Sequence, residues 1–242
     1  MVSVTLLGSA QDGGVPQAGS ANSEELQKRY PVAIGLVDSD GGRHLFDVSR
    51  YLAEQLQIWG QTGVDSIFLT HAHIGHVDGL TLFGKEVMNC QGITLNCSKI
   101  MHDLIKDTPI WSIMVDQGVF TLKTNNFVKL PGVTVEAIEI PHRAELSDMH
   151  AYIIKADKSL LYLPDHDTWR ETLNGHDLRA WLNHLEIDIA LIDGTFFSKD
   201  ELKNRSQEEI PHPPVEQTLE MLGERREGDG EIVFIHLNHT NP

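Results

Sequence analysis

The chain has 242 residues, of which 40% are hydrophobic and 22% charged, a composition that excludes an intrinsically disordered protein and fits a folded one. No apolar run approaches the roughly 20 residues needed to cross a bilayer, so we expect no membrane span. The 19 basic and 35 acidic residues give a formal net charge of −16, which disfavours a protein that grips a long nucleic acid.

Chain length, the N-terminal segment and the cysteine content also indicate the domain organisation and the cellular compartment. We find no repeat and no linker that would divide the chain, and we expect one domain over residues 1–242. The first residues resemble a strand and show no basic segment before a cleavage site, so no signal peptide is expected. The two cysteines, Cys90 and Cys97, do not have metal-ligand spacing. We therefore expect a cytoplasmic protein without disulfides. We expect it to act on a small molecule and not on membranes, and a homodimer stays open as its oligomeric state.

Eleven runs of β-branched and apolar residues predict strands. In chain order they are residues 2–7, 32–37, 44–48, 66–69, 93–97, 119–122, 133–140, 151–156, 159–163, 188–192 and 231–237. Helices are predicted at residues 50–60, 99–106, 169–173 and 215–222, the first of them closed by Gly60. Because the strands fall into two groups with helices between them, we predict an α/β fold in which two sheets pack together with helices outside.

A glycine-rich segment, GSAQDGGVP, follows the first predicted strand at residues 8–16. It lacks the Lys-Ser/Thr ending of a phosphate-binding P-loop and does not match the dinucleotide-binding fingerprint. The first interpretation is a tight loop held by its glycines, and the alternative is a loop that lines an active site.

Three histidines, His71, His73 and His76, stand within six residues directly after the strand predicted at residues 66–69. In α/β proteins, ligand sites lie where strands end, at the carboxyl edge of the sheet. Residues two apart in an extended segment share a face, so His71 and His73 can point at one ion. A helix that begins near Gly75 would move His76 toward a second ion or a water. The grouping is too dense for ordinary surface histidines and predicts a metal site.

Three further side chains follow predicted strands in the same way: His142, Asp165 and His239. Singly each would be an ordinary loop residue, but jointly they could meet the first three histidines on one rim of the packed sheets. Imidazole ligands favour zinc, iron, copper or nickel over magnesium or calcium. A catalytic zinc needs three protein ligands and an open position for water. His236 lies inside the last apolar strand, and we assign it a structural role.

The order of these motifs, His-x-His-x-x-His, a single histidine, an aspartate and a C-terminal histidine, resembles the metallo-β-lactamase superfamily. The resemblance covers nearly the whole chain and implies an αββα four-layer sandwich with one or two metals at its edge. Two segments narrow it to relatives of pyrroloquinoline quinone biosynthesis protein B: LGSAQDGGVPQ at residues 7–17 and FIHLNHTNP at residues 234–242. The segments IPHR at residues 140–143 and DGTFF at residues 193–197 fit the same branch.

The resemblance also implies a ligand set. The first metal would be held by His71, His73 and His142, the second by His76 and His239, with Asp165 bridging the two. The implied cofactor is one or two divalent ions per chain, with zinc as the first expectation and manganese or iron as alternatives.

The chain departs from the family pattern at two places. The usual signature carries an aspartate just before the third histidine, where this chain has Gly75, so we expect the second metal to bind more weakly than the first. Asp78 could substitute, although an acidic residue in the first turn of a helix is common for its interaction with the helix dipole alone. Many relatives carry cysteines near residues 18–22, and their absence here predicts no structural zinc.

A metal held by neutral imidazoles and a carboxylate lowers the pKa of its water and supplies hydroxide as a nucleophile. The candidate catalytic residues are Asp165, as a ligand, and His212, as the proton donor. His212 stands in the segment IPHPP at residues 210–214. Some phosphodiesterases of the superfamily, including tRNA 3′-processing endonucleases, place a catalytic histidine in a comparable segment. The alternative is that His212 only packs beside the three prolines.

Three functions remain open at this point. The leading interpretation is a metal-dependent hydrolase that acts through a metal-bound hydroxide on a small phosphodiester or related ester. The second is iron-dependent oxidation or hydroxylation of a small aromatic or quinone precursor, as the resemblance to the quinone-biosynthesis branch implies. The third is a non-catalytic metal-binding protein. One scaffold hosts many chemistries, so the fold alone does not choose between them.

Overall fold

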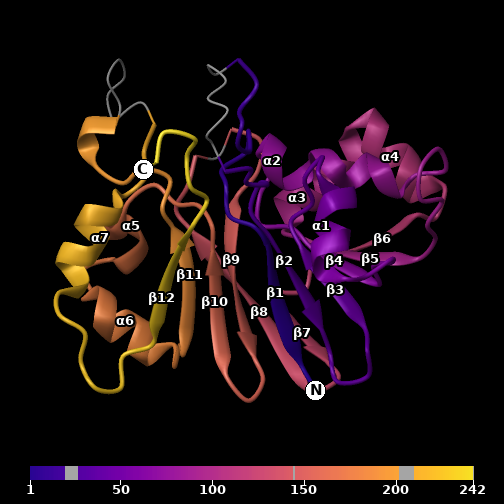
Figure 1. Cartoon of the computed structure of the whole chain (residues 1–242). Coiled ribbons are helices and arrows are strands. Elements are labelled where there is room, and N and C mark those ends of the chain that lie inside the picture. Colours follow the sequence, from indigo (N-terminus) through magenta and orange to yellow (C-terminus); the bar gives the residue numbers. More distant parts are fainter. Residues whose placement is uncertain (20–26, 144, 202–209, 242) are drawn as a thin grey trace.

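The computed structural model describes residues 1–19, 27–143, 145–201 and 210–241. Within these residues the strands form two six-stranded sheets (Figure 1). The first sheet follows the chain order: β1 (Ser3–Gly8), β2 (Ala33–Val37), β3 (Arg43–Phe46), β4 (Ser66–Phe68), β5 (Ile93–Asn96) and β6 (Phe120–Lys123). The second follows it in reverse: β12 (Glu231–Ile235), β11 (Ile189–Asp193), β10 (Ser159–Leu163), β9 (Met149–Lys155), β8 (Val133–Ile140) and β7 (Phe127–Leu130).

Both sheets are antiparallel at one end and parallel at the other. In the first, β1, β2 and β3 are antiparallel, and β3 to β6 are parallel. In the second, β7 to β10 are antiparallel, and β10, β11 and β12 are parallel. Strands β8, β10, β11 and β12 therefore run in one direction, so the residues that follow them gather at one edge of the sheet.

Helices cover the outer faces of the sheets (Figure 1). The first sheet is accompanied by α1 (Leu52–Trp59), α2 (Ile74–Val77), η1 (Asp78–Phe83), α3 (Lys99–Asp107) and α4 (Pro109–Asp116). The second is accompanied by α5 (Trp169–Leu173), α6 (Leu178–His184), η2 (Lys199–Glu201) and α7 (Val215–Leu222). One apolar core joins each sheet to its helices, and a third lies between the sheets. The four-layer α/β sandwich predicted from the sequence is confirmed.

The sequence pattern located most elements within one or two residues. Two predicted strands end early, because Asp47 and His236 have positive φ angles of 61° and 59° and turn the chain out of the extended region. The pattern missed β7, an edge strand with no buried residue. It also missed α4 and α6, of which α4 begins with a proline at the start of its first turn. The helix considered near Gly75 is α2, which begins at Ile74.

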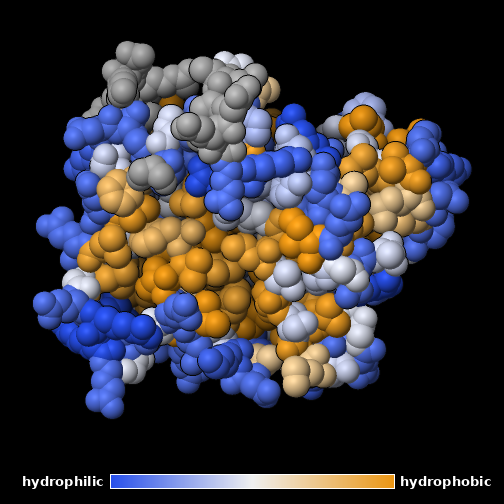
Figure 2. Space-filling view, viewed as in Figure 1, coloured by the Kyte–Doolittle hydropathy of each residue, from blue (hydrophilic) through white to orange (hydrophobic). Residues whose placement is uncertain are grey.

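Apolar side chains form a band on the face shown in Figure 2. Strand β1 is at one edge of the first sheet, and β12 is at one edge of the second. Backbone bonds join the two sheets beyond these strands: Leu237 N–H donates to Ser9 (2.7 Å) and Gln11 N–H to Leu237 (3.0 Å). On the other side of this segment, Ala10 N–H donates to the carbonyl of Tyr30 (2.8 Å). The start of the glycine-rich segment is therefore fixed between the two sheets.

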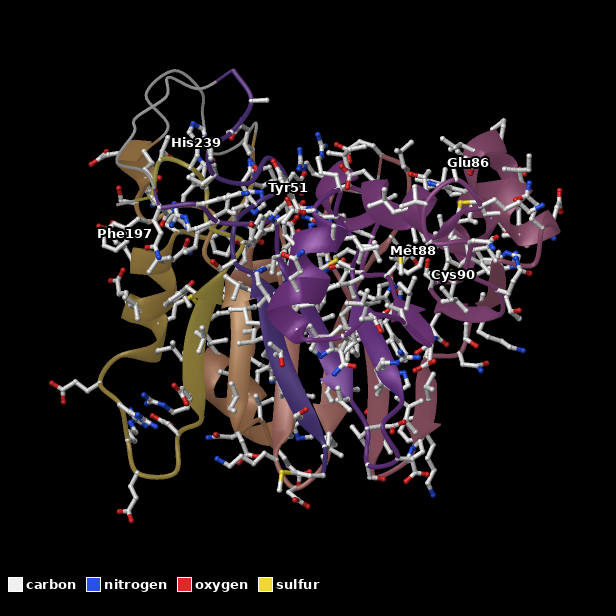
Figure 3. All side chains as sticks on the ribbon, turned by 45° about the vertical axis from the view of Figure 1, so that its right-hand side comes forward. Tyr51, Glu86, Met88, Cys90, Phe197 and His239 are labelled. Atoms are coloured by element: carbon white, nitrogen blue, oxygen red, sulfur yellow. The ribbon has the colours of Figure 1, made fainter. Side chains whose placement is uncertain are left out.

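Several expectations concern features outside the site. None of the described helices is both long and apolar enough for a membrane span. Cys90 and Cys97 are free thiols, the second buried, and Cys90 lies near Met88 in Figure 3. Of residues 18–22, from which we predicted no structural zinc, residues 20–22 lie outside the part that the structure describes.

Candidate metal centre

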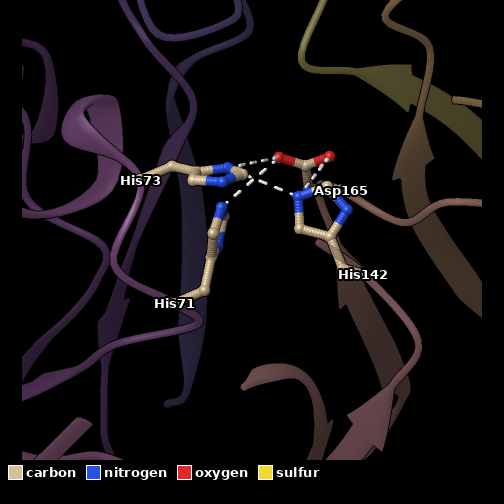
Figure 4. A group of neighbouring side chains, drawn as sticks. All are labelled: His71, His73, His142 and Asp165. Carbon is tan, nitrogen blue, oxygen red and sulfur yellow. Dashed lines mark hydrogen bonds and ion pairs between the residues drawn. The ribbon is translucent and has the colours of Figure 1, made fainter. Parts of the chain in front are cut away.

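Four side chains converge at the edge where the two sheets meet (Figure 4): His71, His73, His142 and Asp165. Asp165 Oδ2 lies 3.4 Å from His71 Nε2 and 3.8 Å from His73 Nδ1. Asp165 Oδ1 lies 3.4 Å from His142 Nε2, which is itself 3.3 Å from His73 Nδ1. His71 and His73 follow β4, His142 follows β8 and Asp165 follows β10, so both sheets contribute to this first group.

The spacing of these atoms fits the ligands of one ion. Ligands about 2.1 Å from a tetrahedral ion lie about 3.4 Å from one another. The observed separations of 3.3–3.8 Å match that distance and exceed an ordinary hydrogen bond. His71 Nε2 and Asp165 Oδ1 are buried and make no hydrogen bond with any described residue. Since buried polar atoms almost always have a partner, these atoms indicate a metal site.

A second group lies beside the first: Asp12, His76 and His236. Asp12 Oδ1 is 3.4 Å from His76 Nε2 and 3.7 Å from His236 Nε2, and His236 Nε2 is 3.7 Å from Asp165 Oδ2. The three facing atoms of this second group are also buried without a hydrogen bond. Asp165 stands between the groups and fits the bridging role that the family resemblance implies.

Hydrogen bonds behind the histidines fix which nitrogen faces each group. Asp47 accepts from His76 Nδ1 (2.7 Å) and from the hydroxyl of Thr70, which in turn accepts from His71 Nδ1 (2.9 Å). Each of these bonds leaves Nε2 directed at the metal position. His142 Nδ1 is held in the same way by Asp167 (2.7 Å).

Asp193 repeats this arrangement on the second sheet. It accepts from His212 Nδ1 (2.7 Å) and from the hydroxyl of Thr195 (2.7 Å), which lies 2.8 Å from His236 Nδ1. Asp47 and Asp193 are both fully buried, and each orients one histidine directly and another through a threonine. The sequence analysis assigned no role to either, although each stands at the end of an apolar strand, which is the signal that singled out Asp165.

The charge states of Asp12, Asp165 and His71 suit metal binding. Burial opposes ionisation of Asp12, but the side chains of His236 and His76 that face it outweigh this effect and lower the pKa of Asp12 well below its ordinary range. Burial likewise opposes ionisation of Asp165, but the charges of His236, His212 and His142 lower its pKa. Burial and the charge of His76 lower the pKa of His71. The carboxylates are therefore anionic and His71 is neutral, the forms that bind a metal.

A cavity of about 1130 Å³ opens onto both groups. Its lining includes His212 and Arg143, whose Nε is buried without a hydrogen bond. Burial opposes the charged form of His212, but Asp193 and Asp165 outweigh it and raise its pKa to about 9. Gln11, Asp12 and Gln17 also line the cavity, so the glycine-rich segment borders the site, as the second interpretation of it proposed.

The structure brings five of the six predicted ligands together and leaves the sixth, His239, outside both groups. His239 (labelled in Figure 3) is in none of the metal-competent groups among the described residues, and its Nδ1 lies 2.9 Å from Asn238 Oδ1. His236, which we had assigned a structural role, lies in the second group instead. Asp78 does not approach either group, because its carboxylate accepts from the backbone and side chain of Arg50 (2.6 and 2.5 Å).

Known proteins resemble the chain over most of its length. The family described as a beta-lactamase superfamily domain matches residues 43–237. Coenzyme PQQ synthesis protein B of Methylorubrum extorquens (strain PA1) is 24% identical over 99% of this chain and 90% of its own. The structure of Zn(2+)-bound PqqB from Methylobacterium extorquens has a TM-score of 0.78 at 22% identity and covers 100% of this chain and 91% of that one. A diphosphatase of the PhnP family has a TM-score of 0.70 at 19% identity, with 100% and 89% covered. At these identities the solved structures show a shared fold.

Proposed function

The chain belongs to the beta-lactamase superfamily, and from that premise we propose that it is a metal-dependent hydrolase of a small phosphodiester or related ester. One observation carries the proposal. Two groups of ligand atoms meet at Asp165, which belongs to the first and lies 3.7 Å from His236 of the second, and they open into the cavity that also contains His212 and Arg143. The site thus combines metal ligands, a proton donor and an anion-binding side chain.

The donor atoms in both groups are imidazole nitrogens and carboxylate oxygens, a set that suits zinc first and manganese or iron next. When bound, a divalent ion supplies Lewis-acid chemistry and lowers the pKa of water, so that hydroxide is available near neutral pH. His71, His73, His142 and Asp165 would hold the first ion.

His212 is suited to protonate the leaving group. Its Nδ1 is committed to Asp193, which leaves Nε2 to exchange a proton with a substrate. The two carboxylates beside it keep the ring protonated near neutral pH, as a general acid requires. Its role as a proton donor is thereby favoured over simple packing beside Pro211, Pro213 and Pro214.

The surroundings of the cavity favour a small anionic substrate. Arg143 offers a guanidinium whose Nε has no hydrogen-bond partner among the described residues, and guanidinium groups bind phosphate oxygens well. Asp200 and Glu201 also line the cavity and would repel an extended polyanion, as would the net charge of −16. The name of the PhnP-family relative, a diphosphatase, adds support for a phosphate ester.

The test is turnover of phosphodiesters by protein purified without added metal. We expect hydrolysis of bis(p-nitrophenyl) phosphate or of a cyclic nucleotide that EDTA abolishes, that zinc or manganese restores, and that His71→Ala lacks. His239→Ala is the matched control, because His239 lies near the same cavity but outside the metal groups. If the fully metal-loaded protein turned over neither substrate, the proposal that it hydrolyses a phosphodiester would be refuted.

A second candidate is iron-dependent oxidation of a small aromatic or quinone precursor. The observation in its favour is the likeness to Coenzyme PQQ synthesis protein B over 99% of the chain. Iron in the purified protein, together with consumption of oxygen in the presence of such a precursor, would favour this reaction. Zinc or manganese without oxygen consumption would favour hydrolysis.

A further inference from the structure

Gly75 and Asp12 compete for one space. A Cβ atom on Gly75 would lie 2.5 Å from both Cα and Oδ1 of Asp12, closer than real side chains approach. Gly75 belongs to the helical turn α2, where any residue could stand, so its backbone conformation does not demand a glycine. The close approach of Asp12 is what requires a glycine at position 75. The aspartate of the glycine-rich segment thus occupies the space into which a side chain at position 75 would extend.

The carboxylate of Asp12 also faces the same histidines that a carboxylate at position 75 would serve. Asp12 Oδ1 is buried, makes no hydrogen bond within the part of the chain that the structure describes, and faces His76 Nε2 at 3.4 Å and His236 Nε2 at 3.7 Å. The opposite nitrogens of these rings are bound to Asp47 and Thr195. Neither ring can therefore turn away without losing a buried hydrogen bond, and both are oriented toward Asp12.

The segment that carries Asp12 is fixed on both sides. Ala10 exchanges backbone bonds with the segment before β2: it donates to Tyr30 and accepts from Val32, both at 2.8 Å. Gln11, which directly precedes Asp12, donates to Leu237 next to His236 (3.0 Å). The aspartate is therefore held in place by both sheets.

We propose that Asp12 is the carboxylate ligand of a second divalent metal, which it holds with His76, His236 and the shared Asp165, in place of the aspartate that the superfamily's usual signature carries at position 75. The inference rests on the metal centre of the proposed function. Its mixed imidazole and carboxylate donors suit Zn²⁺ or Mn²⁺. It replaces our expectation that Gly75 leaves the second position short of a carboxylate.

The test is metal stoichiometry and affinity, measured by elemental analysis and by Zn²⁺ calorimetry on the full chain. Wild type should bind two ions. Asp12→Ala should keep the first site and lose the second or weaken it by at least about 100-fold, since even partners behind the ligands are worth 10–100-fold. Asp12→Asn, which keeps the size of the side chain, should weaken the same site alone. The matched control is Asp78→Asn, which changes a nearby carboxylate bound to Arg50 and should retain both ions.

A variant that removes no ligand sharpens the test. Gly75→Ala adds only a methyl group, but that group would displace the Asp12 backbone, so the second site should weaken while the first is kept. Hydrogen exchange gives a second readout: Zn²⁺ should slow exchange of the amides of residues 11–15 in wild type and not in Asp12→Ala.

Two outcomes would overturn the assignment: wild type that binds a single ion at saturation, or Asp12→Ala that binds two as tightly as wild type. Either result would leave hydrolysis by the first site intact. The opposite combination separates the two proposals. If the protein hydrolyses no phosphodiester but Asp12→Ala still loses the second ion, Asp12 is upheld as a ligand and only the proposed function is refuted.

Discussion

Asp193 Oδ2 lies 2.7 Å from Nδ1 of His212, and both side chains are buried. The carboxylate fixes the ring in the tautomer that carries hydrogen on Nδ1 and favours its protonated form. A histidine held in this way at the edge of a metal site can deliver a proton repeatedly in one orientation.

His212→Ala should leave metal content unchanged and lower turnover of phosphodiesters with poor leaving groups by about two to four orders of magnitude, the usual contribution of a positioned general acid. Esters of nitrophenol need little protonation and should lose far less. Elemental analysis and steady-state kinetics on the two substrate types decide this. Loss of metal in the variant would instead make His212 a ligand, which its 3.2 Å distance to Asp165 allows.

Asp193→Asn should reduce kcat with little change in KM and should move the alkaline limb of the pH profile to lower pH. The sign follows from the pKa of His212, which Asp193 and Asp165 raise to about 9 against the effect of burial. Removal of one carboxylate lowers that pKa, and the acid form is then lost at a lower pH. The measurement is kcat against pH. A limb that stays in place would limit Asp193 to a structural role.

Arg143→Met should raise KM for an anionic ester by about 10- to 100-fold with kcat nearly unchanged, because a charge-assisted hydrogen bond contributes about 1.5–3 kcal/mol. Arg143→Lys should recover only part of the loss, since an ammonium group lacks the planar pair of donors. Kinetics with a neutral ester of similar size provide the control. Equal losses on the neutral ester would argue against anion binding.

His236→Ala and His239→Ala should separate the two C-terminal histidines. His236 belongs to the second group of ligand atoms, so its removal should weaken the second ion. His239 bonds to Asn238 and belongs to no such group, so its variant should retain the metal stoichiometry of wild type. Zn²⁺ calorimetry on both proteins measures this directly, and the reverse ranking would restore the assignment made from the sequence.

Chelation should lower thermal stability. A metal that binds only the folded chain contributes about 4 kcal/mol when its free concentration is 1,000 times its Kd. For a chain of this size that corresponds to a fall of about 8–16 °C in Tm on addition of EDTA. Calorimetric melts with and without EDTA test it. His142→Ala, which lacks a ligand of the first group, should show a much smaller response to EDTA than wild type.

The sequence alone determined the layout of the fold and one half of the site. Strand and helix patterns depend on neighbouring residues, so β8, β10, α5 and α7 could be located to the residue. The rule that ligands follow apolar strands selected His71, His73, His142 and Asp165, which the structure brings together, because strands that run in one direction end at one edge of a sheet.

Only the tertiary structure decided the second group. The hydrophobic pattern predicts that His236 lies in the last strand. In the structure, β12 ends at Ile235, and a positive φ of 59° turns His236 into the site. Hydrophobic patterning does not reveal such a backbone angle. Asp12 meets His76 only because the glycine-rich segment is fixed between the sheets. Gly75 looked like a missing ligand, yet the space beside it is filled by a residue far away in the chain. Steric exclusion between distant segments acts through three-dimensional packing, and no local pattern in the sequence records it.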